Sequence, residues 1–280
     1  MFLLKQILPA AIAAMMVAGG VCGLALFWGK ERARGVLAPG AIGLAYVAGH
    51  FWIAGWAKFP PADTTNWLPY FALAAAIVGA ACSRIASLPG WARLLLFALL
   101  SAGALRILLK PKFQYGWSPG EGWLWVTGLT GALVLLLLIL DVLARRSEIA
   151  FEVPLFLLVI SAGTFGALML SGSMLLGQFA SVLAAAVFGS LLFAARKVEL
   201  GGGVGPVFCL LLGALLVSGY FFASLPAVSG VLLGFAPVLA LTPIGKPGKL
   251  LAFGIRATLV SVTVIVALAA AFRASPPLDY

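Results

Sequence analysis

Long apolar stretches alternate with short polar gaps along almost the whole chain. Each stretch approaches about 20 residues, the length that an α-helix needs to cross the hydrocarbon core of a bilayer. With short connections, the chain has room for about ten such stretches, with eight to ten as the range. The pattern therefore predicts an all-α fold, a polytopic bundle of transmembrane helices. The expected spans are 7–28, 36–57, 67–83, 91–109, 123–143, 153–171, 174–194, 207–225, 229–245 and 250–272.

Two parts of this pattern have an alternative interpretation. The stretch 229–245 contains Pro237 and Pro243, so it is either a full crossing or a broken, partly re-entrant helix. Only residues 171–173 separate 153–171 from 174–194, so these two stretches are either full crossings or one shallow hairpin. Removing such a pair leaves the predicted orientation unchanged.

Composition identifies the solvent of this bundle. Hydrophobic residues make up 63% of the chain and charged residues 9%, with a mean hydropathy of +1.15. This leaves too little polar surface to cover a soluble globule of 280 residues. We expect one integral-membrane domain over residues 1–280, in contact with the lipid bilayer and with no soluble domain.

Lys and Arg are distributed unevenly between alternate gaps, which predicts the orientation because basic residues are retained on the cytoplasmic side. One set of gaps carries twelve basic residues and the other carries six. Both termini are therefore expected on the non-cytoplasmic side of the cell (inner, cytoplasmic) membrane. The twelve are Lys30, Arg32, Arg34, Arg84, Arg93, Arg145, Arg146, Arg196, Lys197, Lys246, Lys249 and Arg256; the six are Lys5, Lys58, Arg106, Lys110, Lys112 and Arg273.

The same distribution accounts for the net charge of +10. The basic residues occur in twos and threes over separate gaps, without a contiguous patch or a soluble module that presents a groove-reading element. Nucleic acid is therefore not an expected partner. Lipids and other membrane proteins are.

Motifs for catalysis, cofactors and metals are missing from the sequence. Cys22, Cys82 and Cys209 lie in or at the ends of three different apolar runs, without a metal-binding or redox spacing. A single histidine lacks the second axial ligand that a membrane haem usually needs. We expect no cofactor and no metal, and the sequence favours a protein that is not an enzyme. A lipid-modifying enzyme is the weakest of the open alternatives.

Four polar residues near or within the apolar runs are candidate binding residues. His50 lies inside the second run, where a polar group is costly and where an imidazole titrates near neutral pH. Its functional interpretation is proton transfer or substrate binding. The structural interpretation, which we favour, is a neutral imidazole hydrogen-bonded across a helix interface, beside Trp52 and Trp56 in the interfacial aromatic belt.

Asp141 and Arg256 are two further candidates, and the pattern places them on the same side of the membrane. Asp141 precedes Arg145 by four residues, which predicts an ion pair within one helix. Arg256 lies about 9 Å into the last run, so an interhelical pair between Asp141 and Arg256 is an alternative. No Asp or Glu lies near the middle of a run, which disfavours a carrier coupled through a buried carboxylate.

The fourth candidate, Gln178, lies in a stretch over 161–190 that is rich in glycine, serine and threonine. Small residues at four-residue spacing, such as Gly163, Ala167 and Ser171, usually allow helices to approach closely. The functional interpretation is a substrate or ion path lined by Gln178 and the hydroxyls. Residues 110–122 are expected to form an irregular loop that leads to Trp123 and either anchors the interface or covers an outward pocket.

Two function classes therefore remain open. In the first, slightly favoured because many-helix proteins without soluble domains often transport, the chain is a small-solute carrier or channel with a cavity among the last five helices and His50. In the second, it is a non-catalytic membrane subunit or scaffold that packs against partner proteins or lipids. A dry, fully packed centre would count against the first class.

Overall fold

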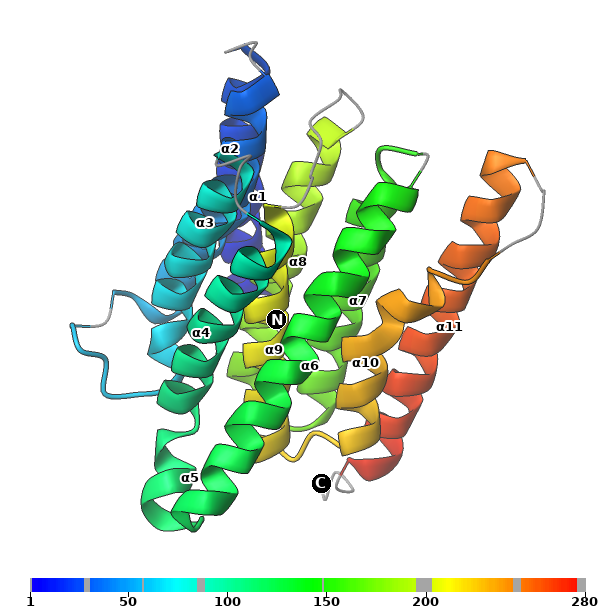
Figure 1. Cartoon of the computed structure of the whole chain (residues 1–280). Coiled ribbons are helices and arrows are strands. Elements are labelled where there is room, and N and C mark those ends of the chain that lie inside the picture. Colours follow the sequence, from blue (N-terminus) through cyan, green and yellow to red (C-terminus); the bar gives the residue numbers. More distant parts are fainter. Residues whose placement is uncertain are drawn as a thin grey trace.

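The computed structural model describes residues 2–27, 31–56, 58–84, 89–147, 149–194, 203–243 and 248–275. Over these ranges the chain forms a bundle of helices without a strand (Figure 1). The predicted all-α fold is confirmed. The helices are α1 (Phe2–Phe27), α2 (Glu31–Ala54), the 3₁₀ helix η1 (Thr65–Trp67), α3 (Leu68–Arg84), α4 (Gly90–Leu108), α5 (Lys110–Tyr115), α6 (Pro119–Arg146), α7 (Glu152–Leu170), α8 (Met174–Ala194), α9 (Val204–Phe222), α10 (Ala227–Leu239) and α11 (Lys249–Ala274).

Nine helices within the described ranges are long and apolar enough to span a membrane. Their bounds fall within a few residues of the predicted spans, and α8 coincides with the predicted 174–194. Helix α6 exceeds its predicted span, 123–143, at both ends, since it begins at Pro119 and ends at Arg146. Pro119 suits the first turn of a helix, and the Ser118 hydroxyl accepts a hydrogen bond from the Glu121 backbone N–H at 3.3 Å.

Helices α7 and α8 form two long antiparallel helices joined by a very tight turn. They have 19 and 21 residues, so the shallow hairpin that the sequence left open is not formed. The turn closes at Gly172, whose φ of 85° is a left-handed conformation that glycine adopts without strain. The Ser173 N–H donates to the Leu168 carbonyl at 3.2 Å, which satisfies one of the last carbonyls of α7.

Of the two interpretations of 229–245, the structure agrees with the broken helix. Helix α10 is too short to cross by itself, yet α9 ends at one end of the bundle and α11 begins at the other, so the chain still passes from end to end between them (Figure 1). Helix α10 has 13 residues and is about 20 Å long, against about 30 Å for the hydrocarbon core. Its end is consistent with proline chemistry, because Pro243 disfavours a helical conformation of the residue before it. In Figure 1 it lies beside only the lower part of α11.

Residues 110–122 are not the irregular loop that the sequence predicted. The helix α5 begins directly after α4, with Pro111 in its first turn, where no backbone donor is lost. The Arg106 guanidinium lies over the Phe113 ring, 3.9 Å from its centroid. This contact connects α5 to α4 at one end of the bundle.

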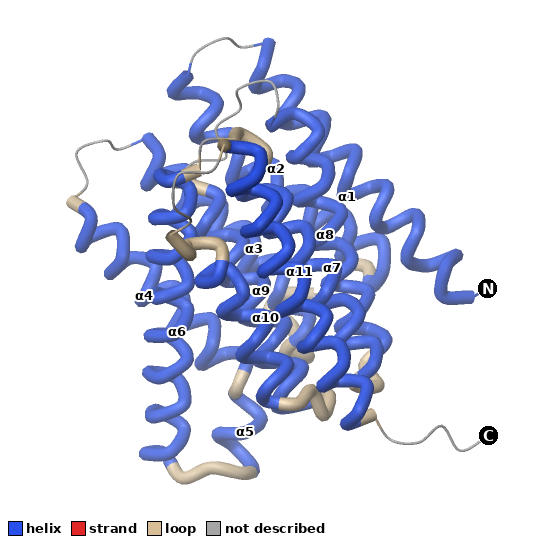
Figure 2. Tube along the Cα trace, turned by 90° about the vertical axis from the view of Figure 1, so that its right-hand side faces the viewer, coloured by secondary structure: helices blue, strands red, loops and turns tan. Residues whose placement is uncertain are grey.

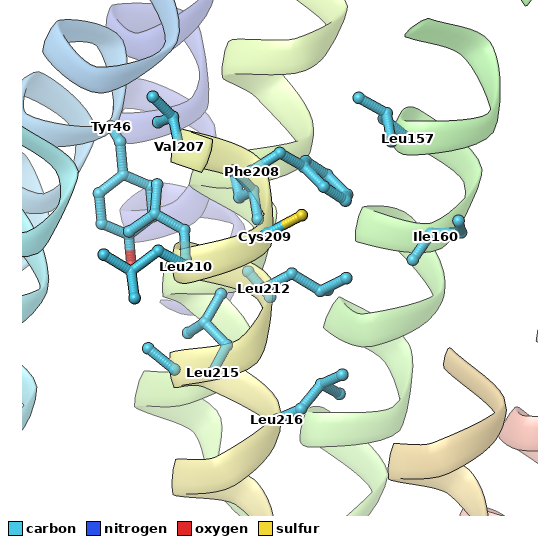
Figure 3. Close-up of a cluster of buried hydrophobic side chains, with 14 of the residues drawn as sticks. Tyr46, Leu157, Ile160, Val207, Phe208, Cys209, Leu210, Leu212, Leu215 and Leu216 are labelled. Atoms are coloured by element: carbon cyan, nitrogen blue, oxygen red, sulfur yellow. The ribbon is translucent and has the colours of Figure 1, made fainter. Parts of the chain in front are cut away.

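Helix α9 lies at the centre of the bundle. In its span 83% of the residues are buried, whereas the other eight spans range from 22% to 61%. Figure 3 shows α9 side chains between Tyr46 of α2 and Leu157 and Ile160 of α7. A helix that is apolar on all sides can lie in a protein core or in lipid, and α9 lies in the core. The centre of the described structure is therefore filled by the apolar side chains of α9.

The two ends of the bundle differ in composition. Helices α2, α4 and α9 end, and α3, α6 and α10 begin, at the end that we call the aromatic end (Figures 1 and 2). Ring contacts are frequent there, as expected at a membrane interface. They join Trp56, Phe59, Trp67 and Tyr70 in one group, and Phe113, Trp117, Trp123, Trp125, Tyr220 and Phe221 in another. The opposite, basic end carries Arg84, Arg93, Arg145, Arg146, Lys249 and Arg256.

Candidate functional site

The four candidate residues lie in two separate places. His50 of α2 and Gln178 of α8 lie near the aromatic end, where Phe179, the residue after Gln178, stacks on the His50 ring at 4.3 Å between centroids. Asp141 and Arg256 lie at the basic end and belong to different ion pairs. The structure thus provides two polar regions, separated by the apolar centre.

His50 is almost fully buried, with 2% of its surface exposed. Neither ring nitrogen has a hydrogen-bond partner among the described residues, although the Thr65 backbone lies nearby. The ring stacks on Phe179 with an interplanar angle of 10°, and Tyr46, one helical turn away, has its own buried hydroxyl without a partner. The predicted hydrogen bond across a helix interface is therefore replaced by stacking across the α2–α8 interface.

A crevice of about 10 Å³ lies beside His50. Its wall includes Val47, Gly55, Asn66 and Tyr70. This volume holds about one water molecule, which would supply the missing hydrogen bond. The crevice is too small for an organic substrate.

Gln178 is buried, with 3% of its surface exposed, next to a series of hydroxyls that bond to their own helices. Each hydroxyl donates to a backbone carbonyl three or four residues earlier, at 2.7 to 2.9 Å, so it is not left facing a path. These hydroxyls belong to Ser161, Thr164, Ser171, Ser181 and Ser190.

The glycines of the same stretch lie against other helices. A Cβ on Gly189 would lie 2.6 Å from the Met15 carbonyl oxygen of α1, and one on Gly163 would overlap Val264 of α11. Both helices approach α7 or α8 at distances that only glycine permits. These contacts agree with the packing interpretation of residues 161–190.

Asp141 forms an ion pair between helices that the sequence did not predict. Its carboxylate lies 3.6 Å from the Arg93 guanidinium, so the pair joins α6 to α4. The predicted partner Arg145 interacts with the Asp141 carboxylate through its charge, whereas the alternative pair with Arg256 is wrong because Arg256 pairs with another carboxylate. The side chains of Asp141 and Arg93 retain 15% and 24% exposure, which leaves the pair partly solvated.

Arg256 pairs with Glu152, a residue that the sequence reasoning did not consider. The distance between Arg256 Nη1 and Glu152 Oε1 is 3.0 Å, and the Ser147 hydroxyl donates to the other carboxylate oxygen at 2.9 Å. The Glu152 side chain is only 2% exposed. The pair joins α11 to the beginning of α7. The available signal was an acidic residue in the first turn of a span on the same side as Arg256.

An apolar groove of about 310 Å³ lies between α6, α9 and α10 at the aromatic end. It is open at the surface, where Tyr220 and Val231 of its wall are exposed. We call it the α10 groove; no pattern in the sequence predicted it. It is lined by Trp125, Leu129, Leu216, Val217, Tyr220, Phe221, Ala227, Gly230, Val231 and Phe235.

Metal-binding groups do not gather in the described ranges: no three His, Cys, Asp or Glu side chains lie together there. Cys22, Cys82 and Cys209 are buried free thiols. No protein-family model, curated protein or solved structure matches this chain.

Proposed function

We propose that this protein is a non-catalytic membrane component that packs against lipids or partner proteins, rather than a carrier. The observation that supports this most is the burial of α9 on all sides. A carrier needs a site near the midplane that water reaches from one face at a time. Helix α9 fills the centre mainly with Val, Leu and Phe side chains. Its Ser218 hydroxyl is buried without a hydrogen-bond partner in the described structure, but one hydroxyl is too little to bind a polar solute.

The polar groups near the centre support the same proposal. The hydroxyls over 161–190 bond to their own helices, and the crevice at His50 has room for one water. Both ion pairs, by contrast, lie at the basic end. Most of these polar groups are thus bonded within a helix or at a helix end, whereas the hydroxyls of Ser101, Thr130 and Ser218 are buried without a partner in the described structure.

Transport remains the second candidate because of two specific observations. Helix α10 is too short to cross, and discontinuous helices form substrate sites in many carriers. Among the described residues, His50 and Tyr46 are buried polar groups without hydrogen-bond partners, a costly arrangement that a passing solute would relieve.

A cysteine accessibility scan separates the two candidates. Cys22, Cys82 and Cys209 are first replaced by alanine, and single cysteines are then placed along 161–190 and around His50. A membrane-impermeant thiol reagent is added to intact cells. We expect protection throughout the interior of the spans.

Two controls fix the scale of labelling. A cysteine at Tyr115, 88% exposed at the aromatic end, should react if that end faces outward, and every site should react after denaturation in detergent. Periodic labelling deep within α7 or α8 would reveal a water-filled path and overturn the proposal in favour of a carrier.

A further inference from the structure

We propose that the α10 groove binds one acyl chain of an anionic phospholipid, with its phosphate at the aromatic end beside Lys112. This inference rests on the proposed function, since it names the lipid that such a membrane component would hold. It is carried by the groove's shape, its apolar wall and the charges beside its outer rim.

The size of the groove selects a chain rather than a helix. A groove of about 310 Å³ is narrow for an α-helix about 10 Å across. A single acyl chain is narrower and flexible. The wall consists of aliphatic and aromatic side chains with the small residues Ala227 and Gly230 on the α10 side, which suits a chain without polar atoms.

The charges near the rim select the headgroup. Lys112 Nζ lies 6.0 Å from the centroid of Phe222, the neighbour of the groove residue Phe221. Trp117, two residues after α5, packs edge-on against the groove residue Phe221 with centroids 5.1 Å apart. Two further cations lie near Lys112: Lys110 is two residues before it, and the Arg106 guanidinium of α4 lies over the ring of Phe113, the next residue.

Acidic residues near this rim are scarce. From Arg106 to Trp125 the sequence contains only one, Glu121. Each lysine or arginine near an anionic bilayer surface attracts it by about 1 kcal/mol. The cations therefore favour a lipid that carries net negative charge over a zwitterionic one.

Photo-crosslinking in nanodiscs tests the proposal. The full-length protein is reconstituted in phosphatidylcholine nanodiscs with a small fraction of phosphatidylglycerol that carries a diazirine on one acyl chain. We expect the crosslinked peptides to come from α10 and the facing part of α9. The same experiment with diazirine-labelled phosphatidylcholine should give weaker labelling at these sites.

Two variants and one matched control define the site. Gly230→Leu fills the groove, since a Cβ at Gly230 meets only Leu225 at 3.8 Å, and labelling should fall by about tenfold or more because several methylene contacts are lost. Lys112→Gln should lower labelling by phosphatidylglycerol by about fivefold and leave phosphatidylcholine unchanged. Gly103→Leu, on the exposed side of α4 with nothing within 4 Å of its Cβ, should change neither.

Either of two results overturns the inference. Labelling of α10 that is insensitive to Gly230→Leu would show that the chain does not lie in the groove. Equal labelling by both lipids in the wild type would show that the headgroup is not selected. The cysteine accessibility scan probes α7, α8 and His50 and is therefore independent of the crosslinking test. Together the two experiments distinguish a carrier that has this lipid site from a packed membrane component that lacks it.

Discussion

The two ion pairs at the basic end differ in how far each is withdrawn from solvent. Glu152 is 2% exposed and also accepts from Ser147, whereas Asp141 and Arg93 are 15% and 24% exposed. Removing one partner of a buried pair costs more than removing one of a solvated pair, because the remaining charge has nowhere to be hydrated.

Glu152→Gln should therefore destabilise the protein by about 3 kcal/mol, and the double variant Glu152→Gln with Arg256→Gln should recover part of this loss. Thermal unfolding of the four proteins in one detergent measures the coupling energy. The matched cycle with Asp141→Asn and Arg93→Gln should give a coupling of about 1 kcal/mol or less. Additive effects at Glu152 and Arg256 would contradict the pairing.

The sequence offered a pair between Asp141 and Arg256 only as an alternative, and it could not identify Glu152 as the partner of Arg256. Spacing within a helix and membrane side are visible in a sequence. The lateral neighbours of a helix are not. Arg256 faces α7 rather than α6, so depth alone pointed to Asp141 instead of Glu152. The stacking of His50 on Phe179 was missed for the same reason.

Helices α1 and α8 approach so closely that a methyl group has no room between them. A Cβ at Gly189 would lie 2.6 Å from the Met15 carbonyl oxygen and 2.9 Å from the Ala18 Cβ. The carbonyl belongs to a helix backbone and cannot rotate away.

Gly189→Ala should accordingly lower the free energy of unfolding by about 1–3 kcal/mol, the usual cost of overpacking. The melting temperature in detergent is the measurement. Gly20→Ala, on the open side of α1 with nothing within 4 Å, is the control and should cause no loss. A tolerated Gly189→Ala would mean that α1 packs less closely than described.

Helix α10 makes a separate prediction about depth. Spin labels at Val228 and Val238, both exposed, should differ in depth by about 15 Å if the helix descends from the aromatic end. Oxygen and nickel accessibility by electron paramagnetic resonance measures this depth, with labels at Leu124 and Leu135 of α6 for calibration. Equal depths would mean that α10 lies flat in the interface.

Hydropathy predicted the nine long helices well because the bilayer itself sets their length. Hydropathy did not predict α5 and α10, because the thickness of the bilayer does not set the length of these short helices. The length of α10 could not be predicted, because a proline indicates that a helix is interrupted but not whether the residues before it or after it are helical. Helix α5 lies outside the apolar runs, and its ring contacts with Trp117 and Trp123 come from residues beyond its own end.

The two ends of the bundle differ in their number of basic residues, and this difference predicts the orientation in the membrane. Twelve of the basic residues fall in gaps on one side and six on the other, and positive charge is retained in the cytoplasm. We expect both termini outside, with the aromatic end outward.

Reporter fusions test this orientation. In a bacterial host, alkaline phosphatase fused after Tyr280 should be active and fused after Arg146 should be inactive, because the enzyme folds only outside the cytoplasm. A green fluorescent protein fused at the same positions should give the reverse signals. The opposite pattern at both positions would overturn the predicted orientation.

The position of each helix within the bundle was not predictable from hydropathy. Helix α6 is the most apolar of the nine long helices in the described ranges, yet only 39% of its residues are buried. Helix α9 is less apolar, and 83% of its residues are buried. Lipid tails and a protein core accept the same apolar side chains, so both environments select the same sequence pattern. The central position of α9, and with it the mainly apolar character of the described centre, could only be seen in three dimensions.

Helix α9 is also synthesised after most of the helices that surround it. The chain is synthesised from its amino end, so eight helices that could span the membrane, α1 to α4 and α6 to α9, enter it in turn, and the hub that touches α2, α3, α4, α6, α7 and α8 is the last of them. Until residues 204–222 leave the ribosome, the earlier helices can pack only on one another, without the helix that fills the centre between them. A ribosome stalled before Val204 should therefore leave a nascent chain with an incomplete core, which membrane proteases should degrade.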